Sequence, residues 1–67
     1  MKEADKMPIV TVQMLEGRTD EQKRALVEEV TTAVSGTIEA PKERISVVIE
    51  EMKPENFGQS GVRAIDK

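Results

Sequence analysis

Cysteine and histidine are both absent from this 67-residue chain, and Phe57 is its one aromatic residue. A domain this short buries only about 60% of the surface that its unfolded chain exposes, so it is marginal as a monomer. Disulfides are excluded. A structural metal is disfavoured, because histidine is missing and no carboxylate spacing matches a metal loop. Oligomerisation is the remaining support for so small a fold. We therefore expect a homo-oligomer.

Long apolar runs and a dominant charge of one sign are missing as well. Ten basic and thirteen acidic residues are interspersed along the chain and give a net charge of −3. Without a basic stripe, nucleic-acid binding is disfavoured. No apolar run approaches the roughly 20 residues of a membrane span, and residues 1–6 lack the apolar centre of a signal peptide. We expect a soluble cytoplasmic protein that binds neither nucleic acid nor membrane.

The first regular stretch begins at a proline. Residues 8–14 predict a strand, because the run from Ile9 to Val12 is entirely β-branched and such side chains suit a pleated surface. Proline suits the first position of a strand, where no ladder hydrogen bond is needed. Thr19 and Gln22 have the spacing of a capping box. A helix is therefore expected to begin at about Asp20.

The predicted helix is amphipathic and ends at Ala40, because Pro41 disfavours helical angles in the residue before it. Residues 41–44 are expected to form one short turn. The apolar positions recur at helical spacing and predict one buried stripe, made of Leu26, Val30, Ala33, Val34 and Ile38. Four charged residues lie largely off the stripe and are expected to face solvent, namely Lys23, Arg24, Glu28 and Glu29.

A second strand is predicted from Ile45 to Met52. Strand, helix and strand in this order predict a β-α-β unit with parallel strands. Residues 58–61 contain two glycines and predict a small hairpin or loop, and residues 62–67 are expected to form a tail. The fold class is therefore α/β, a single small β-α-β unit with a short C-terminal hairpin. Its narrow sheet again calls for partner subunits.

Pro8 carries a chemical possibility that depends on where the mature chain begins. If translation starts at Met7, removal of that methionine leaves Pro8 with a free secondary amine, one of the few groups that titrate near neutral pH. If residues 1–7 are retained as an extension, the nitrogen of Pro8 is a tertiary amide and cannot act as a base. Residues 1–7 are interpreted as a leader, an upstream start or a silencing extension, and residues 8–67 as the domain.

Several short motifs, in order, resemble the 4-oxalocrotonate tautomerase family. They are Pro8-Ile9-Val10, Leu15-Glu16-Gly17-Arg18, Asp20-Glu21-Gln22-Lys23, Glu51-Met52 and Phe57-Gly58. The resemblance implies a hexamer built from dimers and a cofactor-independent tautomerase acting on small unsaturated acids such as 2-hydroxymuconate. It also implies that Pro8 is the base, that Arg18 from a neighbouring subunit contacts a substrate carboxylate, and that Phe57 lines the site.

The chain departs from the family pattern at one position. Well-known members carry a second arginine early in the second strand, where this chain has Ser46. Arg44 lies two residues earlier, and it would be about 6.6 Å away along the strand if the strand already ran there. We hypothesise that Arg44 partly substitutes. Without a second cation, the site should be less efficient with a dicarboxylate.

Plainer interpretations remain beside these. Pro8 can simply start a strand, Arg18 can pair with Glu16 or Asp20, and Phe57 can belong to the core. A non-catalytic assembly protein with a retained extension is one alternative function. A second is hydration or dehalogenation of unsaturated acids, for which Glu16 and Glu51 are the candidate carboxylates.

Overall fold

The structure is a computed structural model, and it describes residues 7–67. The expected extension therefore lies outside the described residues, except for Met7. The elements follow the predicted order of strand, helix, short turn, strand and hairpin. Their bounds are β1 Ile9–Leu15, α1 Asp20–Ile38, η2 Lys42–Arg44, β2 Ser46–Met52, η3 Pro54–Asn56, β3 Gly58–Gln59, β4 Val62–Arg63 and η4 Ala64–Asp66.

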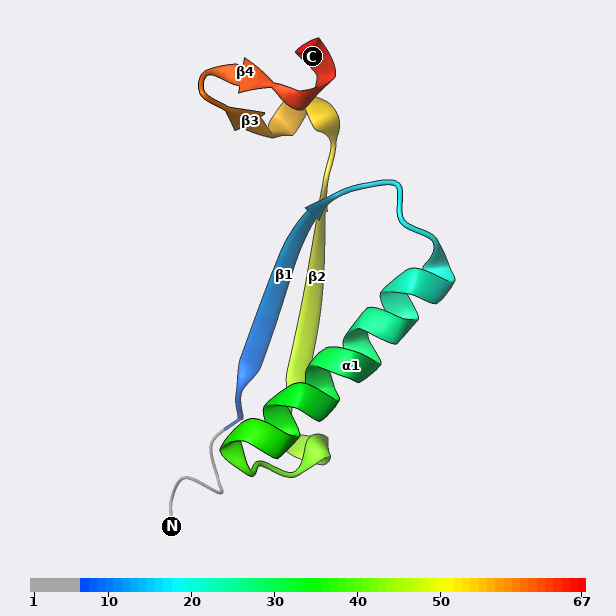
Figure 1. Ribbon diagram of the computed structural model, residues 1–67, viewed down its shortest axis with the longest axis vertical. Coiled ribbons are helices and arrows are strands. Elements are labelled where there is room, and N and C mark those ends of the chain that lie inside the picture. Colours follow the sequence, from blue (N-terminus) through cyan, green and yellow to red (C-terminus); the bar gives the residue numbers. More distant parts are fainter. Residues whose placement is uncertain (1–6) are drawn as a thin grey trace.

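Strands β1 and β2 form a two-stranded parallel sheet, and α1 runs along one face of it (Figure 1). The register runs from Ile9 opposite Ser46 to Leu15 opposite Met52. The backbone N–H of Ser46 donates to the carbonyl oxygen of Pro8 at 3.0 Å, which extends the ladder by one position. The predicted α/β class and the parallel β-α-β unit are confirmed.

The predicted capping box starts α1. The hydroxyl oxygen of Thr19 accepts from the backbone N–H of Gln22 at 3.0 Å, and the side-chain oxygen of Gln22 accepts from the backbone N–H of Thr19 at 3.0 Å. The helix ends at Ile38, two residues before the expected end, because Glu39 adopts a left-handed conformation with φ of 60°. The hydroxyl of Ser35 then donates to the carbonyl oxygen of Ala40 at 2.7 Å.

The two faces of the sheet differ because side chains alternate along each strand. Residues Val10, Val12, Met14, Val47, Ile49 and Glu51 point toward α1. The face away from α1, which we call the open face, carries Ile9, Thr11, Gln13, Leu15, Ser46, Val48, Glu50 and Met52. On the open face the Gln13 amide donates to the Glu50 carboxylate at 2.9 Å.

The apolar stripe of the helix packs less completely than expected. Leu26, Val30 and Val34 are half-buried against the sheet, whereas Ala33 and Ile38 are exposed, because two strands are too narrow to cover the whole stripe. No side chain in residues 7–67 is fully buried. On the open face, Ile9 is 66% and Val48 is 43% exposed. The described part of the chain therefore has no closed core of its own.

The assignment of Lys23 to the solvated face of the helix was wrong. It precedes Leu26 by three residues and Val30 by seven, so it lies on the face turned toward the sheet. Its ammonium is 3.3 Å from the Glu51 carboxylate, and this ion pair connects α1 to β2. Lys23 is half-buried as a result.

The predicted C-terminal hairpin is confirmed, but the expectation of a tail over residues 62–67 was wrong, because β4 and η4 occupy these residues. Ser60 and Gly61 both have positive φ, 54° and 82°, which is the geometry of a two-residue turn that suits the twist of paired strands. Strands β3 and β4 are therefore antiparallel. The hairpin extends beyond the ends of β1 and β2 (Figure 1). Within residues 7–67, no helix combines the length and apolarity needed to cross a membrane.

Candidate functional site

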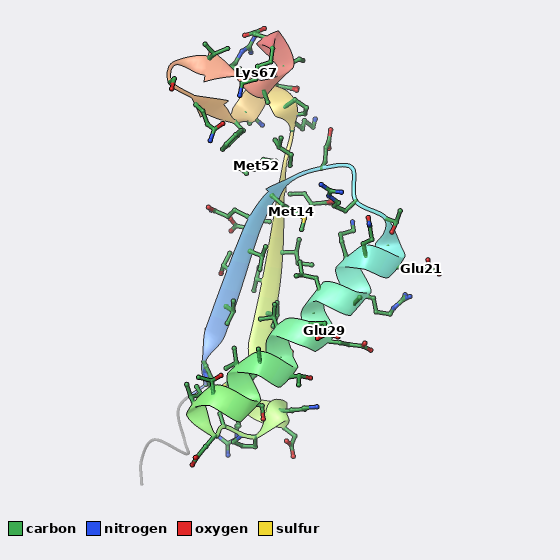
Figure 2. All side chains as sticks on the ribbon, viewed as in Figure 1. Met14, Glu21, Glu29, Met52 and Lys67 are labelled. Carbon is green, nitrogen blue, oxygen red and sulfur yellow. The ribbon has the colours of Figure 1, made fainter. Side chains whose placement is uncertain are left out.

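An open groove of about 510 Å³ lies at the carboxyl ends of β1 and β2. The carboxyl edge of parallel strands is where α/β folds usually bind ligands. The groove is lined by Gln13, Met14, Leu15, Glu16, Gly17, Arg18, Met52 and Phe57. Figure 2 shows Met14 on the side of the sheet facing α1 and Met52 near the hairpin. The groove therefore borders the sheet edge, the β1–α1 connection and the start of the hairpin.

The backbone around Arg18 is held on both sides. Before it, the N–H of Glu16 donates to the carbonyl oxygen of Met52 at 2.9 Å, and Gly17 turns the chain with φ of 124°, a conformation that favours glycine. After it, the capping box fixes the N–H of Thr19, which belongs to the peptide bond that follows Arg18. The position of Arg18 is thus set by local sequence.

Arg18 is the groove's cation, and it is exposed. The expected alternative partner, Asp20, instead pairs with Arg24 at 2.9 Å. Within residues 7–67, no ion pair involves Arg18. Its planar guanidinium can therefore bind a carboxylate by donating two parallel hydrogen bonds. Its role in binding a substrate carboxylate stays a prediction.

Phe57 forms part of the apolar wall of the groove. It follows η3, is half-buried, and its carbonyl oxygen accepts from the N–H of Ala64 at 2.8 Å, which ties it to the base of the hairpin. Leu15 and Met52 stand opposite each other in the strand register and line the same groove. Sequence reasoning missed these two residues as site residues, although the parallel pairing of the strand ends would have placed them together.

Pro8 lies at the other end of the sheet. Leu15 is seven positions further along the chain, which is about 23 Å at the usual rise of a strand. A single chain therefore does not bring Pro8 together with Arg18 or Phe57. In the 67-residue chain, moreover, the nitrogen of Pro8 is joined to Met7 in an amide bond.

The strand geometry assumed for Arg44 does not hold. Strand β2 begins at Ser46, and Arg44 is the last residue of the turn η2. The spacing of 6.6 Å along a strand therefore does not apply. Arg44 is exposed and lies at the same end of the sheet as Pro8. Its ability to replace a cation at position 46 stays a prediction.

The two carboxylates considered for water activation lie in different surroundings. Glu16 lines the groove beside Arg18. Glu51 faces α1 and is paired with Lys23, so it does not line the groove. The only carboxylate that borders this groove among the described residues is therefore that of Glu16.

Comparisons with known proteins agree on one family. A family model described as tautomerase enzyme matches residues 8–67. A probable tautomerase from Listeria monocytogenes is 60% identical over 60 residues, which are 90% of this chain and 98% of that protein. The solved structure of YwhB, a homologue of 4-oxalocrotonate tautomerase, is 57% identical with a TM-score of 0.88, and the match covers 90% of this chain and 98% of that one.

A more distant solved structure has the same fold. It is a heterohexameric 4-oxalocrotonate tautomerase from Chloroflexus aurantiacus, which is 27% identical with a TM-score of 0.86 over 90% of this chain and 97% of that chain. The range matched by the family model, residues 8–67, includes the β-α-β unit and the hairpin together.

Proposed function

Because this chain belongs to the tautomerase family, we propose that it is a cofactor-independent tautomerase. It interconverts the enol and keto forms of small unsaturated 2-hydroxy and 2-oxo acids, of which 2-hydroxymuconate is an example. The observation that carries the proposal is the groove that Arg18 and Phe57 line together, where Arg18 forms no ion pair with any of residues 7–67. The family match, which starts at Pro8, supports it.

In the proposed mechanism Pro8 is the base. Its neutral secondary amine takes the proton from the enol hydroxyl and returns it to a carbon of the same substrate, so no cofactor is required. An amide nitrogen has no available lone pair for this step. The proposal therefore includes removal of residues 1–7, with residues 8–67 as the active domain.

Arg18 and Phe57 complete the reacting centre. Arg18 holds a substrate carboxylate, and the apolar wall around Phe57 disfavours protonation of the amine, because a low dielectric destabilises the charged form. Arg44, at the Pro8 end, supplies a weaker second cation from the η2 turn.

Pro8 and the groove come from different copies of the chain. They lie at opposite ends of β1, so a second copy must bring its groove to the first copy's Pro8. The exposed apolar side chains of Ile9 and Val48 on the open face also call for a partner. We propose a homohexamer, by analogy with the hexameric neighbour.

The first test compares the 67-residue chain with a chain that starts at Met7 and is processed to Pro8. Ketonisation of 2-hydroxymuconate and phenylenolpyruvate is followed by absorbance, with Pro8→Ala in the short chain as the control. Activity in the processed chain alone supports Pro8 as the base. Equal activity in all three proteins would refute the amine mechanism, and inactivity of all three would favour a non-catalytic assembly protein.

The second test asks whether the site is shared. The short chains carrying Pro8→Ala and Arg18→Ala are each expected to be inactive, and co-expression should restore activity in about a quarter of the sites if subunits mix at random. Each restored site takes Pro8 from one copy and Arg18 from another. If co-expressed chains stay as inactive as the separate variants, both residues act within one chain.

A further inference from the structure

The groove carries one positive and one negative side chain. Arg18 and Glu16 both line it, two residues apart on the β1–α1 connection. The groove can therefore neutralise one carboxylate at Arg18. A second carboxylate on the same ligand would find no further cation in the groove lining and would meet the carboxylate of Glu16.

The nearest other cation is already engaged. A smaller hollow of about 240 Å³ beside the groove is lined by Arg18 and Lys23 together. The ammonium of Lys23, however, forms an ion pair with the Glu51 carboxylate and donates a hydrogen bond to it at 3.3 Å. Its charge is compensated within the chain, so it offers a second carboxylate little attraction.

The remaining lining of the groove is mostly apolar. It consists of Met14, Leu15, Met52 and Phe57, together with Gly17 and Gln13. The Gln13 amide already donates to the Glu50 carboxylate at 2.9 Å. Thioether, leucine and aromatic surfaces gain free energy when an apolar group displaces water from them, and methionine adapts to ligands of different shapes. This surface suits a hydrocarbon or aromatic tail, and it gives a distal carboxylate no cation besides Arg18.

The Pro8 end of the sheet is also uncharged along its strands. Ser46 stands opposite Ile9 in the strand register, and its backbone N–H donates to the Pro8 carbonyl oxygen at 3.0 Å. The adjacent Ile9 side chain is 66% exposed. Arg44 precedes this pair on a turn and is exposed to solvent, so water competes for any anion that it attracts.

We infer that the site prefers monocarboxylic enols with an apolar or aromatic tail, such as aryl enolpyruvates, over dicarboxylic enols. This inference rests on the proposed function and names its substrate class. Arg18 binds the carboxylate and the tail lies along Met52 and Phe57. The amine of Pro8 removes the proton from the C2 hydroxyl and delivers it to C3. The C2–C3 double bond becomes single, the C2–O bond becomes a carbonyl, and no other reactant is consumed.

The kinetic test uses the chain processed to Pro8 with two probes, phenylenolpyruvate and 2-hydroxymuconate. The ratio of their kcat/KM values is expected to favour the monocarboxylate by about tenfold or more. Ser46→Arg and Glu16→Gln should each move this ratio toward the dicarboxylate, because one adds a cation and the other removes a repelling charge. Thr32→Arg, on the exposed outer side of α1, adds the same cation elsewhere and should leave the ratio unchanged.

A preference of the unsubstituted chain for 2-hydroxymuconate would overturn the inference and leave the tautomerase assignment standing. The same conclusion follows if Ser46→Arg and Glu16→Gln shift the ratio no more than Thr32→Arg does. Turnover of neither probe would instead count against the proposed function.

A binding measurement then decides the groove's preference without turnover. Calorimetric titration of the 67-residue chain measures the dissociation constants of two ligands. One is trans-cinnamate, a monocarboxylate with an aromatic tail, and the other is the dicarboxylate trans,trans-muconate. Tighter binding of cinnamate, abolished by Arg18→Ala, supports the inference. Equal or tighter binding of muconate refutes it.

Discussion

Val48→Lys should break the assembly of this protein. Val48 lies in the middle of β2 on the open face, and it is 43% exposed in the single chain although valine is an apolar residue. Across the strand register it stands beside Thr11, and Ile9 lies further along β1 on the same face. If a second copy covers this face, a lysine at position 48 is forced into an apolar contact.

The size of the effect can be worked out from the exposed fractions. Fully burying a valine or isoleucine side chain is worth about 1.5–3 kcal/mol, so covering the exposed 66% of Ile9 and 43% of Val48 contributes about 2 kcal/mol per copy. A contact between two copies thus gains about 4 kcal/mol from these residues, roughly a thousandfold in the dissociation constant. An ammonium group buried without a partner costs several kcal/mol more.

Light scattering after size-exclusion chromatography measures the mass of the assembly, and thermal unfolding at several protein concentrations measures its stability. Val48→Lys should lower the mass and the Tm, and should make the Tm more dependent on concentration. Thr32→Lys is the matched control, because it replaces another β-branched residue at an exposed position on α1. If both variants keep the mass and the Tm of the unsubstituted protein, the open face is not an interface and the reasoning is refuted.

Three further substitutions test the local backbone, each by urea denaturation at fixed protein concentration. Gly17→Ala should lower the free energy of unfolding by about 1–2 kcal/mol through the φ of 124° alone, since nothing lies within 4 Å of an added Cβ. It should also raise KM by displacing Arg18. An unchanged urea midpoint would contradict this. Thr19→Ala should lower the free energy of unfolding by about 1 kcal/mol, because it removes the cap on α1. A decrease below about 0.3 kcal/mol would show that the cap is dispensable. Ser60→Asn should stabilise the hairpin by about 0.5 kcal/mol, because asparagine tolerates the φ of 54° better than serine does; destabilisation would refute that reading.

The sequence was most informative where the structure depends on neighbouring residues. The capping box of Thr19 and Gln22 fixed the start of α1, and the β-branched runs fixed both strands within one residue. Two short-range features were missed because single residues decided them. Glu39 took a left-handed conformation and ended α1 early. Ser60 did the same in the turn of the predicted hairpin, whose second strand occupies Val62–Arg63, where a tail was expected. Left-handed Glu and Ser carry no strong sequence signal.

The candidate site was harder to predict from the sequence, because contacts between segments far apart in the chain bring its residues together. Arg18 could be recognised from its loop, but its freedom from Asp20 depends on Arg24 taking that carboxylate. The burial of Lys23 depends on Glu51, which lies 28 residues away. The position of Arg44 depended on where β2 begins, which is the least certain property of a strand from sequence alone.

The lack of a closed core and the separation of Pro8 from the groove have the same origin in the β-α-β unit. A single helix covers one face of two strands, so Ile9 and Val48 stay exposed on the other face. The same two strands are about 23 Å long over seven residues, so the proline at one end cannot reach the groove at the other. A partner that covers the open face or joins the edge of this sheet in the opposite direction would bring its groove end toward the first copy's Pro8, as the proposed function requires. Covering the apolar surface and completing the reacting centre would then be one event, and a chain that fails to assemble should lose activity together with stability.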